Sequence, residues 1–456
     1  MRYLVIVDGD HYPPVVAAAL EHLLEQGHAI AGVVLAGGAE KLPTEGAPAY
    51  GVGPLRTGPD PALELDRAIA DLAPEAVLDL ADEPVLDYRR RHELAAVALA
   101  RSVAYEGADF AFTPPQRPKL STRPSIAIIG TGKRTGKTAI AGLAARSLKG
   151  AGYSPVLVAM GRGGPAEPEV LRGDRVALAP TDLVALADAG KHAASDYIED
   201  ALTARVPTVG GHRCGGGLAG AVAFSNMGPA IAMANQIEGD ITILEGSGSA
   251  LPPAHSEVTA LVVPASVDME FLRGYMGPYR LLLSDFILVT MCEEPFGSPS
   301  QISAIRSLLR ESFSNLRKGG VRAALEVVHT VFRPAPLGQV GGASVFVVTT
   351  APQAAGGVIK RHLEDQHGCK VLGVSHALAD RQRLKRELDT GGKGADVLLC
   401  ELKAAAVDVA TRWALDSGVR VVYMDNVAEG VDGADPSLMF VRAAELAAER
   451  FEKESI

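Results

Sequence analysis

The sequence predicts an α/β protein whose central part is a doubly wound, mainly parallel sheet. Short apolar runs rich in Val, Ile and Leu alternate with helical patterns along the chain, and one of these runs leads into a glycine-rich loop followed by a helix. The chain has 456 residues, of which 47% are hydrophobic and 21% charged, so it can bury several cores. We expect three sections, residues 1–120, 121–335 and 336–456.

The amino-terminal section is expected to be a Rossmann-like α/β unit. Asp8, Asp10 and His11 follow its first strand, where sheets of this kind place ligands, although a surface turn before Pro13 explains them equally well. The proline-rich segment 112–124 favours an extended connector to the next section. The predicted strands are 4–7, 30–35 and 76–80, and the predicted helices are 14–25 and 61–72.

A phosphate-binding loop opens the central section. An apolar strand at 125–129 precedes Gly-Thr-Gly-Lys-Arg-Thr-Gly-Lys-Thr at 130–138, and a helix follows. Such a loop surrounds nucleotide phosphates with backbone N–H groups, while its lysine reaches the terminal phosphates and its hydroxyl ligates Mg²⁺. The sequence therefore predicts P-loop NTPase character, with ATP and Mg²⁺ as cofactors. The residues expected to bind the nucleotide are Gly130, Thr131, Gly132, Thr135, Gly136, Lys137 and Thr138.

A carboxylate at a strand end completes the predicted nucleotide site. The apolar run 241–244 leads to Glu245 and then to a Gly/Ser turn, which places the acid at the carboxyl end of a parallel strand. We expect Glu245 and Thr138 to hold Mg²⁺. A solvent-facing Glu245 is the alternative. The other strands predicted for this section are 155–160, 259–263 and 286–290.

The carboxyl-terminal section is expected to be a third α/β unit, and it carries no second phosphate loop. It begins beyond the proline-rich stretch that starts at Arg333. Its predicted strands are 344–349, 370–374, 397–400 and 419–424.

Composition argues against several classes of protein. The formal net charge is -10 and no basic run is present, which argues against a nucleic-acid partner. No apolar stretch approaches the ~18 residues of a membrane span, and the first strand does not resemble a signal peptide, so we expect a cytoplasmic protein. The four cysteines are widely spaced, which indicates neither a disulfide framework nor a zinc site.

Two sets of motifs resemble known enzymes. The Gly-Thr pair ahead of Gly136-Lys137-Thr138, and Glu245 with the glycines after it, are similar to the corresponding loops of dethiobiotin synthetase and its cobyrinic-acid amidase relatives. The chain as a whole resembles the cyclic 2,3-diphosphoglycerate synthetase family. The blocks that carry this resemblance are 8–14, 80–86, 130–138, 160–165, 195–201, 213–217, 244–248, 290–295 and 401–408.

This resemblance implies an enzyme that uses ATP to close a phosphoanhydride between the two phosphates of 2,3-diphosphoglycerate, releasing ADP and phosphate. Because two anions must approach each other, such a reaction needs concentrated positive charge. We expect Lys133, Arg134, Lys137 and Glu245 to be catalytic.

Substrate phosphates are expected to bind Arg162, His212 and Arg213, since the planar guanidinium group of arginine bonds two oxygens at once. An exposed turn is the alternative explanation for Arg162, and neither spacing nor motif fixes the direction of His212 and Arg213. We expect a homodimer, by analogy with other multidomain α/β enzymes.

Two other functions remain open at this point. One is an ATP-dependent carboxylate ligase of the dethiobiotin synthetase or amidase type. The other is a non-enzymatic nucleotide switch that loads a metal or a protein partner, although such a switch usually has a metal-binding His/Cys run and this chain has none.

Four further residues have structural explanations. Asp196 and Glu199 fit the start of a helix, with Asp196 as the N-cap and Glu199 reaching back to it, and we prefer this interpretation to a functional one. Lys403 either reaches a substrate or opens a helix. A thiolate nucleophile at Cys292 is not expected, because no histidine or lysine lies near it in sequence to lower its pKa.

Overall fold

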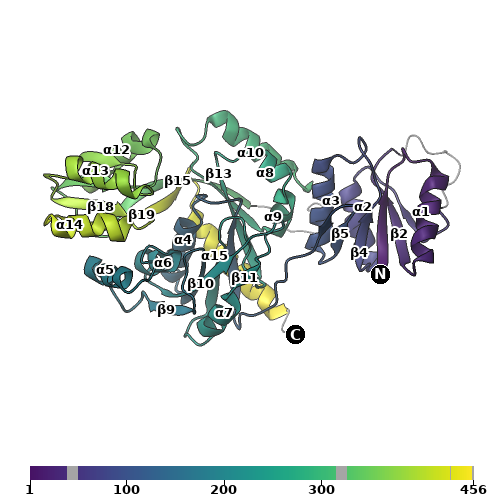
Figure 1. Cartoon of the computed structure of the whole chain (residues 1–456), viewed down its shortest axis with the longest axis horizontal. Coiled ribbons are helices and arrows are strands. Elements are labelled where there is room, and N and C mark those ends of the chain that lie inside the picture. Colours follow the sequence, from purple (N-terminus) through teal and green to yellow (C-terminus); the bar gives the residue numbers. More distant parts are fainter. Residues whose placement is uncertain (39–49, 315–325, 432, 454–456) are drawn as a thin grey trace.

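Two β-sheets organise the chain (Figure 1). The computed structural model describes residues 1–38, 50–314, 326–431 and 433–453. Within these residues, a six-stranded sheet forms the amino-terminal part and a thirteen-stranded sheet runs through the rest. The predicted α/β class is confirmed, and every strand predicted from the sequence is present. Helices cover both faces of the larger sheet, as a doubly wound fold requires.

The amino-terminal sheet has the order β3-β2-β1-β4-β5-β6 and is parallel except for β6. Asp8, which follows β1 and is buried, accepts hydrogen bonds from the backbone N–H groups of Asp10, His11 and Asp82, and these bonds fix the turn that follows the strand. The strands are β1 (Arg2–Val7), β2 (Ala29–Leu35), β3 (Leu55–Arg56), β4 (Ala76–Asp79), β5 (Ala104–Glu106) and β6 (Ala111–Phe112). The helices are α1 (Pro13–Glu25), α2 (Pro61–Leu72) and α3 (Tyr88–Ala100).

The central part of the larger sheet has the order β11-β10-β8-β12-β7-β13-β14. Its inner strands are completely buried runs of aliphatic residues, which is typical of parallel strands covered on both faces. The strands are β7 (Ser125–Gly130), β8 (Pro155–Gly161), β9 (Glu169–Arg172), β10 (Pro207–Cys214), β11 (Phe224–Ser225), β12 (Ile241–Glu245), β13 (Val258–Pro264) and β14 (Phe286–Thr290). The helices are α4 (Lys137–Gly150), α5 (Pro180–Asp188), α6 (Asp196–Ala204), α7 (Met227–Asn235), α8 (Glu270–Arg273), α9 (Gly277–Leu283) and α10 (Pro299–Glu311).

One long strand, β15 (Glu326–Pro336), joins the central strands to the carboxyl-terminal ones. Its first half pairs in parallel with β14, and its second half pairs antiparallel with β19 (Arg420–Gly430). Strand β15 is not among the strands predicted from the sequence. Its second half contains Pro334 and Pro336, which lack the N–H groups of a regular ladder. The sheet continues with β18 (Val397–Glu401), β16 (Ser344–Val348) and β17 (Lys370–Ser375).

Most of the carboxyl-terminal helices pack on the carboxyl-terminal strands of the sheet, but the last helix packs on the central part. Helix α15 (Pro436–Lys453) packs against α4 and β7 and buries Phe440 and Ala444 there. The division at residues 120 and 335 therefore stays a prediction. The other elements of this region are α12 (Gly356–His367), α13 (Arg381–Gly391), the π-helical turn η3 (Ala406–Thr411) and α14 (Arg412–Asp416). None of the helices in the described ranges is long and apolar enough to cross a membrane.

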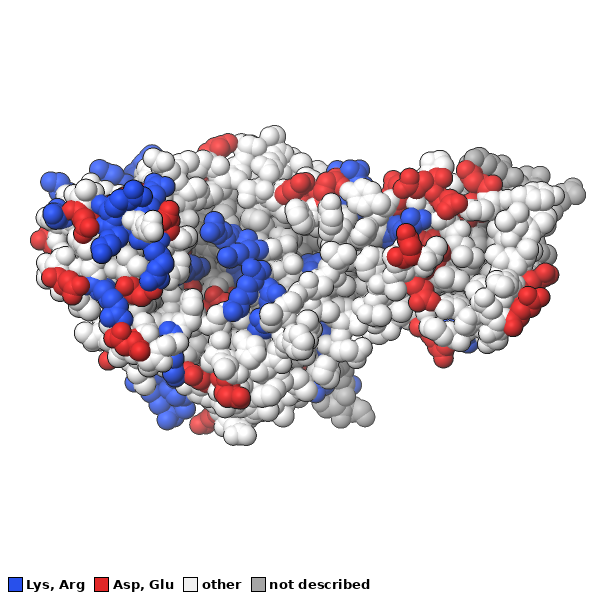
Figure 2. All heavy atoms as spheres, in the orientation of Figure 1, with Lys and Arg blue, Asp and Glu red and all other residues white. Residues whose placement is uncertain are grey.

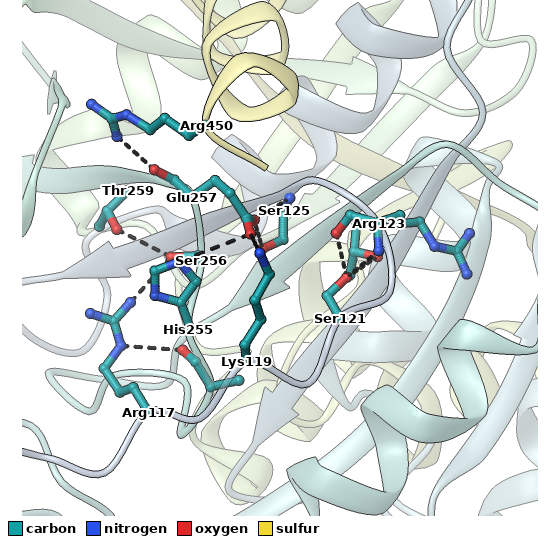
Figure 3. A network of polar contacts seen from close by, with 12 residues as sticks. Arg117, Lys119, Ser121, Arg123, Ser125, His255, Ser256, Glu257, Thr259 and Arg450 are labelled. Carbon is teal, nitrogen blue, oxygen red and sulfur yellow. Dashed lines mark hydrogen bonds and ion pairs between the residues drawn. The ribbon is translucent and has the colours of Figure 1, made fainter. Parts of the chain in front are cut away.

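The buried carboxylate of Glu257 fastens the connector at residues 112–124 to the large sheet, at the end where strands β7 and β13 begin (Figure 3). Glu257 is 4% exposed and accepts hydrogen bonds from the backbone N–H and the hydroxyl of Ser125 at 2.8 and 2.7 Å, and Lys119 of the connector lies 3.7 Å away. Arg450 of α15 donates to the Glu257 carbonyl at 2.6 Å and to Asp285 at 2.7 Å. The connector, strand β7 and helix α15 thus share one polar anchor.

Replacing Glu257 with alanine is expected to lower the free energy of unfolding by about 3 kcal/mol, because the backbone N–H and the hydroxyl of Ser125 would lose their acceptor in a buried position. Chemical denaturation measures this change. Glu449→Ala is the matched control, since Glu449 pairs with exposed Lys453 on the surface, and it should leave the free energy of unfolding nearly unchanged. Equal losses in the two variants would contradict the anchoring role.

Candidate nucleotide and phosphate site

The phosphate loop joins the end of β7 to the start of α4. Gly136 has a φ of +93° and precedes the first residue of the helix, and no side chain of the described residues caps that helix start. The backbone N–H groups of the first turn are therefore available to an anion. The hydroxyl of Thr290, at the end of β14, donates to the carbonyl of Thr135 at 2.9 Å and so holds the loop from the neighbouring strand.

Lys137 folds back over the loop that precedes it. Its ammonium donates to the Gly132 carbonyl at 2.7 Å and to the Thr135 hydroxyl at 3.3 Å. Burial lowers the pKa of Lys137, while the nearby carboxylate of Glu245 opposes that shift. These acceptors belong to the loop itself, and phosphate oxygens can replace them without moving the backbone.

Thr138 and Glu245 lie in contact, as expected for a pair that binds Mg²⁺. The Thr138 hydroxyl donates to Glu245 Oε1 at 2.9 Å, and Glu245 is 2% exposed at the end of β12. Burial raises the pKa of Glu245, and neighbouring Asp196 raises it further. Its other oxygen, Oε2, is buried without a donor among the described residues. A hydroxyl beside an orphaned carboxylate oxygen fits a hard divalent cation, which prefers oxygen ligands.

Arg162 and Arg213 converge on the turn that follows Glu245. A Cβ placed on Gly248 would lie 2.6 Å from an Arg162 guanidinium nitrogen and 3.0 Å from one of Arg213. Arg213 also donates to the Ser247 carbonyl at 2.8 Å, and its pKa is lowered by burial and then by the charge of Arg162. Two cations this close repel each other unless an anion lies between them. The arrangement suits a phosphate group.

His212 lies on the other side of strand β10 from Arg213, because neighbouring residues of a strand point to opposite faces. Its ring Nδ1 lies 2.8 Å from the Pro165 carbonyl, and its backbone N–H donates to Asn226 at 2.6 Å. The structure therefore does not bring His212 together with the two arginines.

The remaining loop cations face outward. Lys133 and Arg134 are both exposed, and Arg134 adopts a φ of +60°, which is uncommon for a residue with a side chain. Arg134 lines a cavity of about 540 Å³ between the loop and the carboxyl-terminal strands. Figure 2 shows Lys and Arg side chains on both sides of the hollow between these two parts of the molecule.

The carboxyl-terminal strands contribute Glu401 and Lys403 to the wall of this cavity. Glu401 is held by the hydroxyls of Thr349 and Thr350 at 3.0 and 2.9 Å and by Asn426 at 2.9 Å. Lys403 does not open a helix. Its ammonium lies 3.2 Å from Glu199 of helix α6, which places it within the central part of the molecule.

The capping interpretation of Asp196 and Glu199 is wrong. Ser195 precedes the helix, Asp196 is its first residue, and no side chain of the described residues caps the helix start. Glu199 is buried, and burial raises its pKa to about 8 even though the ion pair with Lys403 opposes the shift. Asp196 acts electrostatically on both Lys137 and Glu245. Sequence reasoning missed these acids because a helix-start pattern does not show which way the helix faces.

A phosphate loop between a strand and a helix of a doubly wound sheet, with an acid at the end of the neighbouring strand, defines a P-loop protein. The chain belongs to the cyclic 2,3-diphosphoglycerate synthetase family. Models of that family's N-terminal domain, P-loop domain and C-terminal domain match residues 2–113, 125–318 and 336–427.

Two relatives illustrate the similarity. The chain is 45% identical to the cyclic 2,3-diphosphoglycerate synthetase of Rubrobacter xylanophilus over 450 residues, which cover 97% of this chain and 98% of the relative. It is 41% identical to that of Methanothermobacter thermautotrophicus over 443 residues, covering 95% and 94%. Among solved structures, LpxK from Aquifex aeolicus in complex with ATP covers 72% of this chain and 90% of its own, with a TM-score of 0.41 and 13% identity, a likeness too weak to support an inference.

Gly136 is a loop position at which a side chain would clash and strain the backbone. A Cβ there would lie 2.4 Å from the ring of Phe332, and the left-handed backbone adds further strain. Gly136→Ala should therefore lower the free energy of unfolding of the nucleotide-free protein by at least about 1 kcal/mol.

Gly132→Ala is the matched control within the same loop, because a Cβ added at Gly132 would meet no atom within 4 Å and the φ of this residue is not positive. Thermal unfolding without nucleotide should show a loss only for the change at Gly136. A similar loss at Gly132 would mean that the loop is sensitive to any side chain.

Proposed function

We propose that this chain uses ATP to form the intramolecular phosphoanhydride of cyclic 2,3-diphosphoglycerate from 2,3-diphosphoglycerate, releasing ADP and phosphate. The observation that carries the proposal is the convergence of Arg162 and Arg213 on Gly248, outside the loop that surrounds the phosphates of the nucleotide. A P-loop protein that acts only on ATP has no need of this second cationic site. The names of the relatives support the same substrate.

The reaction is proposed to take place in two displacements. A phosphate oxygen of the substrate attacks the γ-phosphorus of ATP, the bond from that phosphorus to the β,γ-bridging oxygen breaks, and ADP leaves. An oxygen of the other substrate phosphate then attacks the activated phosphate, and inorganic phosphate leaves as the ring closes. The attacking oxygens are already anionic near neutral pH, so no general base is required.

Each part of the site has a proposed role in this sequence. Lys137 stabilises charge on the transferring phosphoryl group, with Lys133 and Arg134 at the mouth of the loop. Arg162 and Arg213 hold the substrate phosphates. His212, which we expected in the same group, has its ring on the Pro165 carbonyl and is the weakest member of the proposal.

Thr138 and Glu245 are proposed to hold Mg²⁺. The bound ion would neutralise charge on the nucleotide phosphates. A homodimer and a cytoplasmic location are also kept as proposals.

Analysis of the reaction by ³¹P NMR tests the proposed function. Incubation with ATP, Mg²⁺ and 2,3-diphosphoglycerate should produce a new anhydride resonance together with ADP and inorganic phosphate in equal amounts. A carboxylate ligase would instead release phosphate only when an amine or CO₂ is supplied, and it would give no new anhydride resonance. That result would refute the proposal.

Lys137→Ala should lower kcat by on the order of 10³, because it removes a positive charge needed as the phosphoryl group is transferred. The fold should remain intact, as shown by an unchanged circular dichroism spectrum. Lys149→Ala, at the other end of helix α4, is the control and should have normal turnover. Near-normal turnover of the Lys137 variant would remove the loop from the chemistry.

Arg162→Ala and Arg213→Ala should each raise the KM for 2,3-diphosphoglycerate by roughly tenfold to a hundredfold, the loss expected for one charge-assisted phosphate contact. The KM for ATP should change little, and lysine at either position should restore only part of the loss. Steady-state kinetics with each substrate varied in turn measures both constants.

Arg175→Ala is the control for these arginine changes, since Arg175 is exposed and lies near Asp174 on the surface. A rise in the KM for ATP alone would place Arg162 and Arg213 in the nucleotide site.

A further inference from the structure

Helix α6 turns an acidic face toward the phosphate-loop helix. Asp196, Glu199 and Asp200 lie at spacings of three and four residues, which places them on one side of the helix, and α6 packs against α4. Glu199 and Asp200 are buried. The apolar residues of α6 are buried as well, so the helix has no exposed charged face of the kind that an ordinary amphipathic helix turns to water.

Asp200 differs from the other buried acids described here. It is 0% exposed, and no N–H or O–H donor of the described residues reaches either oxygen of its carboxylate. Glu257 and Glu401, by contrast, each accept several hydrogen bonds, and Glu199 has Lys403.

The neighbours of Asp200 make its position more costly. The charges that act on it belong to Glu245, Glu199 and Asp196, all of them acids, and its carboxyl group meets that of Glu245 directly. A buried carboxylate without a partner costs several kcal/mol, so it either takes up a proton or is compensated by a cation. An unsatisfied acid next to a second unsatisfied oxygen, Glu245 Oε2, indicates that the compensating group is a cation held between them.

We infer that Asp200 belongs to the divalent-cation site of this protein, as a carboxylate that binds the ion or one of its water ligands behind Glu245. The inference rests on the proposed Mg²⁺ site at Thr138 and Glu245 and extends it to a second acid on a different element. Two carboxylates balance the double charge of the ion, and hard divalent cations take carboxylate and hydroxyl oxygens as ligands. Helix α6 then has a function beyond packing, because it carries part of the metal site to the loop.

Mn²⁺ serves as the probe, and electron paramagnetic resonance counts the free ion during titration of the full-length chain with saturating ADP. Asp200→Asn should raise the Kd for Mn²⁺ by ~10-fold or more, the range found when a group that supports a metal ligand is removed. Glu245→Gln should raise it at least as much. Glu199→Gln is the matched control, since Glu199 lies on the same buried face but pairs with Lys403, and its Kd should stay near that of the unmodified chain.

Thermal unfolding without metal separates a metal-binding role from a structural one. Asp200→Asn removes a buried acid that no N–H or O–H donor of the described residues reaches, so the unfolding midpoint should stay the same or rise. Glu199→Gln should lower it, because Lys403 loses its partner. If Asp200→Asn lowers the midpoint, Asp200 is a structural residue and the inference is wrong. Asp200→Ser provides a second variant at this position. Binding of ADP without metal checks that the site of each variant is folded.

The other outcomes are equally distinct. An unchanged Kd in Asp200→Asn with a raised Kd in Glu245→Gln would overturn the inference and leave the proposed Mg²⁺ site standing. Unchanged Kd values in both variants would overturn the proposed site itself. If Glu199→Gln raises the Kd for Mn²⁺ as much as Asp200→Asn does, the effect comes from the total charge of α6. Asp200 would then not be a specific part of the cation site, and the inference would be wrong.

Discussion

The contact between Thr138 and Glu245 joins the two elements on which the site depends. Thr138 is the second residue of α4, Glu245 is the last residue of β12, and β12 lies beside β7, the strand that leads into the loop. The register of β7 and β12 pairs Ile128 with Glu245, so the acid reaches the level of the loop only because these strands align in this way. A shift of one residue would turn Glu245 to the opposite face of the sheet.

Several ionisable side chains are buried close to that contact. Lys137, Glu245, Glu199 and Asp200 are all buried, and most of them are balanced by a neighbour of opposite charge. The carboxyl-terminal strands take part in this balance through Lys403, which β15 and β19 bring to the central sheet. The charges around the nucleotide site therefore come from both the central and the carboxyl-terminal strands of the large sheet.

The sequence predicts the parts of the site whose signal is local. The loop from Gly130 to Thr138 follows from a strand, a glycine-rich turn and a helix in succession, and Glu245 follows from a strand end before a Gly/Ser turn. Each of these two signals lies within one short segment. Strand β15 could not be predicted in this way, since it is fixed by pairing with β14 and β19, which lie far from it in sequence.

The acids of α6 escaped prediction for a related reason. Their residue types fit a helix start, and only the packing of α6 on α4 turns them inward. Arg162 was predicted from its residue type and its place after a strand, and Arg213 from its type and the glycines that follow it. Their convergence on Gly248 depends on how β8, β10 and the turn after β12 lie together.

Helix α15 has a consequence for how the chain acquires its fold. During synthesis from the amino terminus, β7 and α4 leave the ribosome long before the residues of α15, yet α15 covers part of their apolar surface. That surface stays open to water, and to chaperones, until the rest of the large sheet has been made. The packing around β7 and α4 is then completed by a segment made much later, so the nascent chain must postpone this part of its packing.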